Sequence, residues 1–271
     1  MEPLILVTND DGVLSPGIVA AVEAVQDLGE VLISAPRYQQ TSMSRAFPIG
    51  DGLGRIDVID LEVGSYLHRG FGVYGSPAQA VSHAMLEIAA RPPDLCVSGI
   101  NYGENLGMSV FHSGTIGAAL EASTYGIPGL AVSLEASVEL HHAEDYQPMD
   151  WQIAKHLTRL LAAQILNEGL SGDIALLNAN VPGGATPETE VRVTTQSKQD
   201  YLVLEKPGGR DFAAPLRLET AVRIDESTLE ANCDIRAFAL DQVVSVTPMT
   251  WSLTAKERWM PRFCATMGPP S

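Results

Sequence analysis

The stretch Leu4-Ile-Leu-Val-Thr-Asn-Asp-Asp-Gly12 decides the fold that we expect for this chain. Its first four residues are apolar and a polar turn follows at once, so the pattern predicts a buried strand that ends in a loop. Ser15 can cap a helix that has Pro16 at its first position and an apolar face between Val19 and Leu28. Strand, acidic loop and helix in this order are typical of a parallel α/β sheet, whose ligand crevice lies at the carboxyl ends of the strands.

Asp10 and Asp11 are adjacent carboxylates in that loop. Carboxylate oxygens are the ligands that hard divalent cations such as Mg²⁺ or Mn²⁺ prefer, so the two residues are candidate metal ligands. The same residues also suit an ordinary surface turn, because Asn, Asp and Gly favour turns for local reasons. The remaining loops of the chain must decide between the two interpretations.

Two further polar loops follow predicted strands. The strand expected over residues 30–35 leads into a hydroxyl-rich loop at residues 37–44, and the strand expected over residues 94–98 leads into a loop with Asn101 and Asn105. The side-chain oxygen of Asn101 can ligate a hard cation, and exposed backbone N–H groups near Asn105 can bind phosphate. Taken singly, each loop also suits a plain connection.

A helix is predicted from Ser113-Gly114-Thr115 to about Tyr125, with Gly126 as its end. Small residues leave the first N–H groups of a helix open, and that end carries partial positive charge. The pattern therefore indicates an anion site that needs no lysine. Simple helix capping uses the same geometry and stays open as the alternative.

The second half of the chain changes character near residue 185. Before it, we predict a helix over residues 151–168 and a strand over 174–178; His141 and His142 lie in a polar connection that we interpret as a solvated loop rather than a metal site. After it, the strands expected over residues 190–195, 201–205 and 216–224 follow one another without a helix between them, and a short helix is expected over residues 234–239. We therefore expect an α/β domain at residues 1–184, a β-rich appendage at 185–232, and a final core strand with a C-terminal oligomerisation arm at 233–271.

Composition excludes several classes of protein. The formal net charge of −16, with only four lysines among 271 residues, opposes binding to polymeric nucleic acid. A small phosphorylated ligand would have to be held mainly by a metal and by backbone amides. The chain shows no membrane-length apolar run and no basic signal-peptide start, which favours the cytoplasm. Three separated cysteines without a CxxC pair support neither a zinc site nor a disulfide framework.

Several motifs occur together in a fixed order. They are Asn9-Asp-Asp-Gly-Val13, Ala35-Pro36, Ser98-Gly-Ile-Asn101, Asn105-Leu-Gly107, Ser113-Gly-Thr115 and Val244-Ser-Val-Thr-Pro248. In these motifs the chain resembles the SurE family, the survival-protein-E acid phosphatases and 5′-nucleotidases. The resemblance implies a Rossmann-like three-layer domain with a mostly parallel sheet, and a C-terminal appendage exchanged between the subunits of a homodimer or homotetramer.

The resemblance also implies the residues of the site. The expected metal ligands are Asp10, Asp11, Thr41 and Asn101. The expected phosphate-binding residues are Asn105, Ser113, Gly114 and Thr115. The family usually has Ser-Gly where this chain has Thr41-Ser42, which leaves open which hydroxyl is the ligand, and it commonly has Asp-Cys in place of Gln79-Ala80, which leaves the nucleotide preference open.

The function expected from the residues and the resemblance is a metal-dependent phosphomonoesterase. It would hydrolyse nucleoside 5′-monophosphates with Mg²⁺ or Mn²⁺, with 3′-nucleotides and short polyphosphate as further candidate substrates. Asp10 would orient or deprotonate the attacking water, whereas the role of His112 stays open. A nucleotide-sensing protein without catalysis is the alternative; a dinucleotide-using oxidoreductase is disfavoured, because no GxGxxG follows the first strand.

Overall fold

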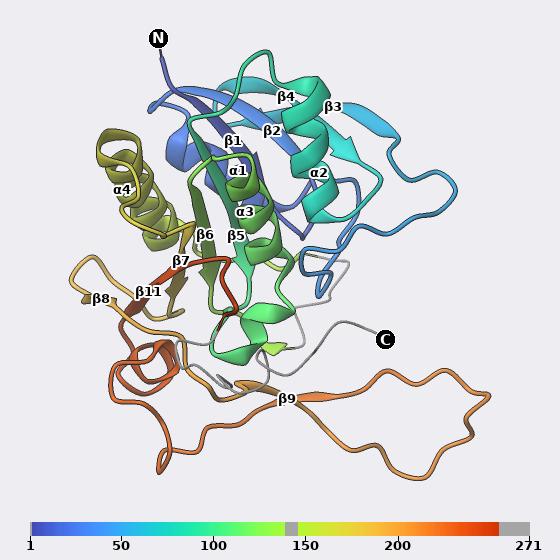
Figure 1. The fold of residues 1–271 in the computed structure, drawn as a ribbon, viewed down its shortest axis with the longest axis vertical. Coiled ribbons are helices and arrows are strands. Elements are labelled where there is room, and N and C mark those ends of the chain that lie inside the picture. Colours follow the sequence, from blue (N-terminus) through green and yellow to red (C-terminus); the bar gives the residue numbers. More distant parts are fainter. Residues whose placement is uncertain (1, 139–145, 255–271) are drawn as a thin grey trace, which may run out of the picture.

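A central mixed sheet organises the molecule (Figure 1). In the computed structural model, which describes residues 2–138 and 146–254, nine strands of this described part form one sheet in the order β3-β4-β2-β1-β5-β6-β7-β11-β8. Its strands are β1 (Leu4–Thr8), β2 (Glu30–Pro36), β3 (Ile56–Val63), β4 (Tyr66–Val73), β5 (Leu95–Tyr102), β6 (Gly129–Leu134), β7 (Leu176–Val181), β8 (Val191–Val193) and β11 (Val244–Met249). Neighbouring strands are parallel except for the antiparallel pairs β3–β4 and β7–β11.

Helices cover both faces of this sheet, which confirms the predicted three-layer α/β class. They are α1 (Pro16–Val25), α2 (Pro77–His83), α3 (Gly114–Thr124) and α4 (Gln152–Glu168). Successive side chains of a strand point to opposite faces. Ile5 and Val7 of β1 accordingly pack in one cluster with α1 and α4, whereas Leu6 packs with α2 and α3 on the other face.

The predicted helix starts are confirmed by their caps. Ser15 accepts a hydrogen bond from the N–H of Ile18 at 3.3 Å, and Ser113 accepts one from the N–H of Ile116 at 3.1 Å. Ser76 forms a capping box with Gln79 at the start of α2. Each cap satisfies an N–H group that has no partner inside the helix. All three helices begin at the carboxyl edge of the sheet, next to the loops that follow β1, β2 and β5.

Three elements differ in extent from their predictions. The strand expected over residues 94–98 continues as β5 to Tyr102, so Asn101 lies on a strand end rather than in a free loop. The strand expected over residues 174–178 lies two to three residues later, as β7. The short helix expected over residues 234–239 is a π-helix at Arg236–Leu240. Further π- and 3₁₀-helical turns are η1 (Ala84–Ile88) and η2 (Met108–Phe111).

The β-rich C-terminal part consists of a hairpin and strands that join the main sheet. β9 (Leu202–Leu204) and β10 (Thr220–Val222) form an antiparallel pair that projects away from the sheet (Figure 1). β8, which falls in the range predicted for the appendage, pairs with β11 at the edge of the main sheet instead. The predicted exchange of this part between subunits concerns a second chain and stays a prediction.

Hydrogen bonds to Asp234 connect this C-terminal part to the core. Its buried carboxylate accepts hydrogen bonds from the backbone N–H groups of Gly107 and Ser197, each at 2.9 Å, and from that of Ile235 at 2.8 Å. Gly107 belongs to the loop that follows β5, whereas Ser197 leads into the hairpin. One carboxylate thus connects the loop that carries Asn105 to the hairpin.

Two cysteines that the structure describes, Cys96 and Cys233, are buried free thiols. Trp251 and Leu253 of the apolar C-terminal stretch are 62% and 81% exposed in the single chain. The predicted solvated loop with His141 and His142 lies outside the described residues, and so does the last part of the predicted arm. Among the described helices, none has the length and apolarity needed to cross a membrane.

Candidate active site

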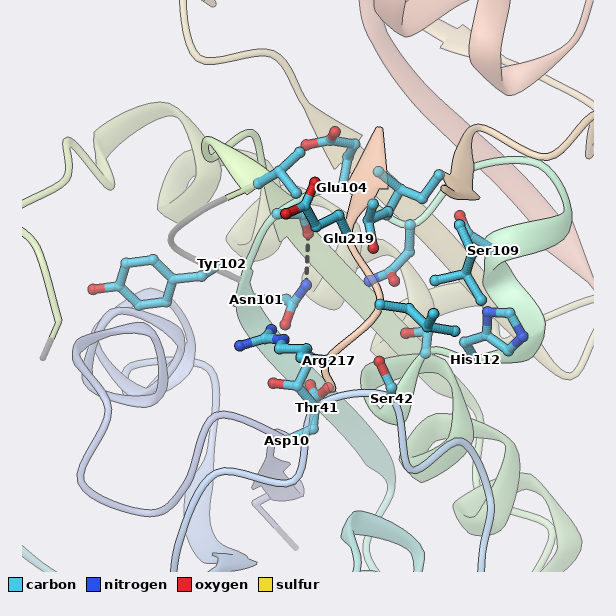
Figure 2. A pocket seen from close by; sticks show the side chains of 18 residues that line it. Asp10, Thr41, Ser42, Asn101, Tyr102, Glu104, Ser109, His112, Arg217 and Glu219 are labelled. Atoms are coloured by element: carbon cyan, nitrogen blue, oxygen red, sulfur yellow. Dashed lines mark hydrogen bonds between the residues drawn. The ribbon is translucent and has the colours of Figure 1, made fainter. Parts of the chain in front are cut away.

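A cavity of about 900 Å³ opens at the carboxyl ends of the parallel strands. It is lined by five of the residues predicted for the site: Asp10, Thr41, Asn101, Asn105 and Ser113. Figure 2 shows Asp10, Thr41 and Asn101 reaching the cavity from separate segments of the chain. Asp11, Gly114 and Thr115 do not line the cavity. Each of them forms a hydrogen bond with a residue that does.

Asp10 is the centre of the arrangement and is only 3% exposed. Its Oδ1 atom accepts a hydrogen bond from the Thr115 hydroxyl at 2.6 Å, and its carboxylate also accepts one from the N–H of Gly114. The N–H of Gln40 donates to the backbone oxygen of Asp10 at 2.7 Å. The first acidic loop, the loop after β2 and the start of α3 therefore meet at this residue.

Gly114 permits this close approach. A Cβ atom built on Gly114 would lie 2.7 Å from Cβ and 2.8 Å from Oδ2 of Asp10, closer than side chains pack. Only a glycine lets the helix start contact the carboxylate without displacing it.

Asp11 is held on a different set of donors and is 1% exposed. The N–H of Tyr102 donates to its Oδ2 atom at 3.3 Å, and the side chain of Gln39 donates to its Oδ1 atom at 3.4 Å. The hydroxyl of Tyr146 donates to the backbone oxygen of Asp11 at 2.6 Å. The end of β5 is thereby joined to the acidic loop.

The buried carboxylates of Asp10 and Asp11 favour the binding of a cation. Burial raises the pKa of both carboxyl groups above the ordinary 3.8, and the neighbouring charge of Asp10 raises the pKa of Asp11 further. Within residues 2–138 and 146–254, neither carboxylate forms an ion pair with a basic side chain. Two buried carboxylates without a counter-charge are unfavourable when ionised, and a divalent ion would relieve this.

Asn101 presents the oxygen that such an ion needs. Its side-chain nitrogen donates to the backbone oxygen of Gly103 at 2.5 Å, so the amide oxygen stays available as an acceptor. Figure 2 shows this oxygen directed to the side of the cavity on which Asp10 and Thr41 lie. Carboxylate, amide and hydroxyl oxygens thus face one region, and their chemistry fits Mg²⁺ or Mn²⁺.

The loop after β2 brings both candidate hydroxyls, Thr41 and Ser42, to the cavity. Ser42 has a φ of 66°, in the left-handed region that glycine adopts most readily. The N–H of Ser44 donates to the backbone oxygen of His112 at 3.1 Å, which ties this loop to the start of α3. His112 lines the cavity as an exposed side chain.

The predicted phosphate-binding residues fall into two pairs. Asn105 donates from its side chain to the Ser133 hydroxyl at 2.9 Å and lines the cavity, as Ser113 does. Gly114 and Thr115 instead direct an N–H and a hydroxyl donor to Asp10. The N-terminal end of α3 therefore presents polar groups both to the Asp10 carboxylate and to the cavity.

Sequence reasoning did not single out Glu104, Arg217 and Glu219, which also line the cavity. Glu104 is 5% exposed; burial raises the pKa of its carboxyl group, and its Oε2 atom has no hydrogen-bond partner among the described residues. Arg217 and Glu219 are exposed residues of the hairpin. No local pattern marks them, because only the tertiary position of the hairpin brings them to the site.

Comparisons with known proteins identify the family of this chain. A family model described as "Survival protein SurE" matches residues 5–202, well over half of the chain. This chain belongs to the SurE family. The resemblance of its motifs is thereby confirmed.

Members of the SurE family from other organisms match over most of their length. A protein of Methanocella arvoryzae named "5′-nucleotidase SurE" is 38% identical and covers 94% of each chain. One of the same name from Methanothermobacter thermautotrophicus is 40% identical over 77% of this chain and 80% of its own. The crystal structure of the SurE protein from Aquifex aeolicus superposes with a TM-score of 0.71 at 28% identity, covering 93% and 95% of the two chains.

Proposed function

We propose that this chain is a metal-dependent 5′-nucleotidase, which hydrolyses nucleoside 5′-monophosphates to nucleoside and phosphate. The observation that carries the proposal is the pair of buried carboxylates, Asp10 and Asp11, which have no basic partner among the described residues and lie at the edge of an open cavity. The relatives that match across nearly the whole chain bear the name of this activity. 3′-Nucleotides and short polyphosphate are further candidate substrates.

In this proposal Asp10, Asp11, Asn101 and Thr41 hold a Mg²⁺ or Mn²⁺ ion. All four supply oxygen donors, and the two buried carboxylates provide the charge that such an ion balances. A bound divalent ion supplies Lewis-acid polarisation of a phosphoryl oxygen and makes a water molecule more acidic.

The residues of the chain would divide the remaining work. Asp10 orients the attacking water and accepts its proton, while the Thr115 hydroxyl and the Gly114 N–H fix the position of its carboxylate. Asn105, in the loop after β5, and Ser113, at the positive end of α3 to which Gly114 and Thr115 also belong, bind the phosphoryl oxygens. The wide cavity accommodates the nucleoside.

A phosphate-release assay tests this function. We expect AMP to release inorganic phosphate in the presence of Mg²⁺ or Mn²⁺ and not in the presence of a chelator. Binding of AMP without phosphate release would favour the nucleotide-sensing alternative, and tight binding of NAD without metal would favour the oxidoreductase. A panel of 5′- and 3′-nucleotides with each metal determines the base, sugar and metal preferences.

Metal should stabilise the folded protein, and more so at high pH. Because the pKa values of Asp10 and Asp11 are raised by burial, the metal-free fold is favoured when both are protonated and loses stability as pH rises above 3.8. We expect the rise in Tm on adding Mn²⁺ to be larger at about pH 8 than at about pH 5. Each kcal/mol of unfolding free energy that the bound metal adds corresponds to a rise of about 2–4 °C in Tm. A double variant, Asp10→Asn with Asp11→Asn, should lose the gain, and an equal gain in that variant would place the metal elsewhere.

The two candidate hydroxyls can be separated by a pair of substitutions. Ser42 occupies the left-handed conformation and corresponds to the glycine of the family, which supports Thr41 as the ligand. We expect Ser42→Gly to retain activity and gain up to about 1 kcal/mol of stability. Thr41→Val should reduce phosphate release at limiting metal. The reverse pattern of activities would assign the ligand to Ser42.

The homodimer or homotetramer with an exchanged arm and the location in the cytoplasm stay predictions, as does the division at residues 184 and 232. Size-exclusion chromatography with light scattering measures the assembly directly.

A further inference from the structure

We infer that Arg217, on the hairpin segment that leads into β10, is a substrate-binding residue that contacts the phosphoryl group of the nucleotide. This inference rests on the proposed phosphatase function and adds to it a residue outside the motifs of the family. It also gives the C-terminal hairpin a role in the active site.

The charges around the cavity provide the first argument. The carboxylates of Asp10, Glu104 and Glu219 line it, and Arg217 is the one lysine or arginine among the described residues that do so. A phosphate monoester carries up to two negative charges, which these carboxylates would repel. A metal at Asp10 and Asp11 offsets part of this repulsion, and Arg217 supplies the remaining positive charge.

The hydrogen bonds of the hairpin provide the second argument. Arg210 donates to the backbone oxygen of Ala214 at 2.6 Å, and Arg223 forms an ion pair with Glu205 at 2.9 Å. Arg217 has no hydrogen bond or ion pair to any residue in the described ranges. Its N–H donors are therefore available to a ligand, in contrast to those of its neighbours.

The direction of the side chain provides the third argument. Figure 2 shows the Arg217 guanidinium reaching into the cavity on the side where Asn101 and Asp10 lie. A guanidinium presents a planar fork of N–H groups that fits two phosphate oxygens at once. Leu202 and Leu218 of the same hairpin also line the cavity and offer apolar surface to the nucleoside.

Steady-state kinetics with AMP and Mn²⁺ test the inference, with Arg217→Gln as the variant. Charge-assisted hydrogen bonds to phosphate predict that KM rises by about 10- to 100-fold, while kcat changes by less than about threefold. Arg217→Lys should recover part of the loss, because it restores the charge but not the fork. The KM of the wild type should also rise more steeply with salt than that of Arg217→Gln.

Arg210→Gln is the matched control, since it removes the same charge from the same hairpin at a side chain that does not line the cavity. A KM of Arg217→Gln equal to that of Arg210→Gln would overturn the inference, whatever the change in kcat.

A second measurement separates this outcome from a failure of the proposed function. If the wild type releases no phosphate from AMP, the function falls, and calorimetric titration of inorganic phosphate into the Mn²⁺-loaded proteins then decides. Binding weakened about tenfold or more in Arg217→Gln supports a phosphate contact. Equal binding by the two proteins, or none by either, rejects it.

Discussion

Replacing Asp10 with asparagine is expected to reduce phosphate release from AMP by about 10²- to 10⁴-fold, the range that a positioned general base contributes. Asparagine keeps the shape of the side chain and can still accept from the Thr115 hydroxyl. It cannot accept a proton from water, and it contributes no negative charge to a metal. The chemistry should therefore be lost while the contacts around residue 10 persist.

The measurement is phosphate release under saturating AMP and Mn²⁺, together with thermal unfolding. Because Asp10→Asn removes a buried negative charge, the metal-free variant should be at least as stable as the wild type near neutral pH. Asp51→Asn, in an exposed loop, is the matched control and should retain full activity. Turnover by Asp10→Asn within tenfold of the wild type would contradict the assigned role.

Replacing Gly114 with alanine is the second change with a large expected effect. Alanine suits a helix better than glycine, and in open space this change would stabilise α3 by up to about 1 kcal/mol. Here the added Cβ meets Asp10 at 2.7 Å, so either the carboxylate or the helix start must move. A displacement of about 1 Å at a catalytic group can reduce the rate by about 10²-fold, and overpacking costs about 1–3 kcal/mol.

We therefore expect Gly114→Ala to lose about two orders of magnitude in kcat and to unfold at a lower temperature. Kinetics and thermal unfolding measure the two effects separately. Gly184→Ala serves as the control, because a Cβ there meets no atom within 4 Å. Wild-type kcat in Gly114→Ala would show that the contact with Asp10 does not position the carboxylate.

The elements around the site were predictable because their signals are local. Ser15 and Ser113 mark helix starts through a hydroxyl and the residues directly after it, and β1 shows its burial as an unbroken apolar run. The approach of Asp10 to Asn101 follows from topology, because β1 and β5 are parallel neighbours and their carboxyl ends share one edge. This approach can be predicted from the order of the strands alone, without knowing which side chains lie between Asp10 and Asn101.

Other features depend on contacts between distant segments and left no local signal. β7 pairs with β11 across more than sixty residues, and β8 is drawn to the sheet only through β11. The hydroxyl of Thr115, which the sequence predicts to bind phosphate, also donates to Asp10, a contact that exists only because the folded chain places the two residues side by side. Arg217 reaches the cavity from an exposed hairpin for the same reason.

The three hydrogen bonds that Asp234 accepts bear on how this enzyme can be engineered. Because one carboxylate accepts hydrogen bonds from both Gly107 and Ser197, the position of the hairpin depends on that of the loop that carries Asn105. A chimera that borrows its hairpin from another family member would have to import the matching anchor as well. Truncation after residue 184 would likewise remove β11 from the sheet and the anchor from the loop, so the first 184 residues do not constitute a transplantable minimal enzyme.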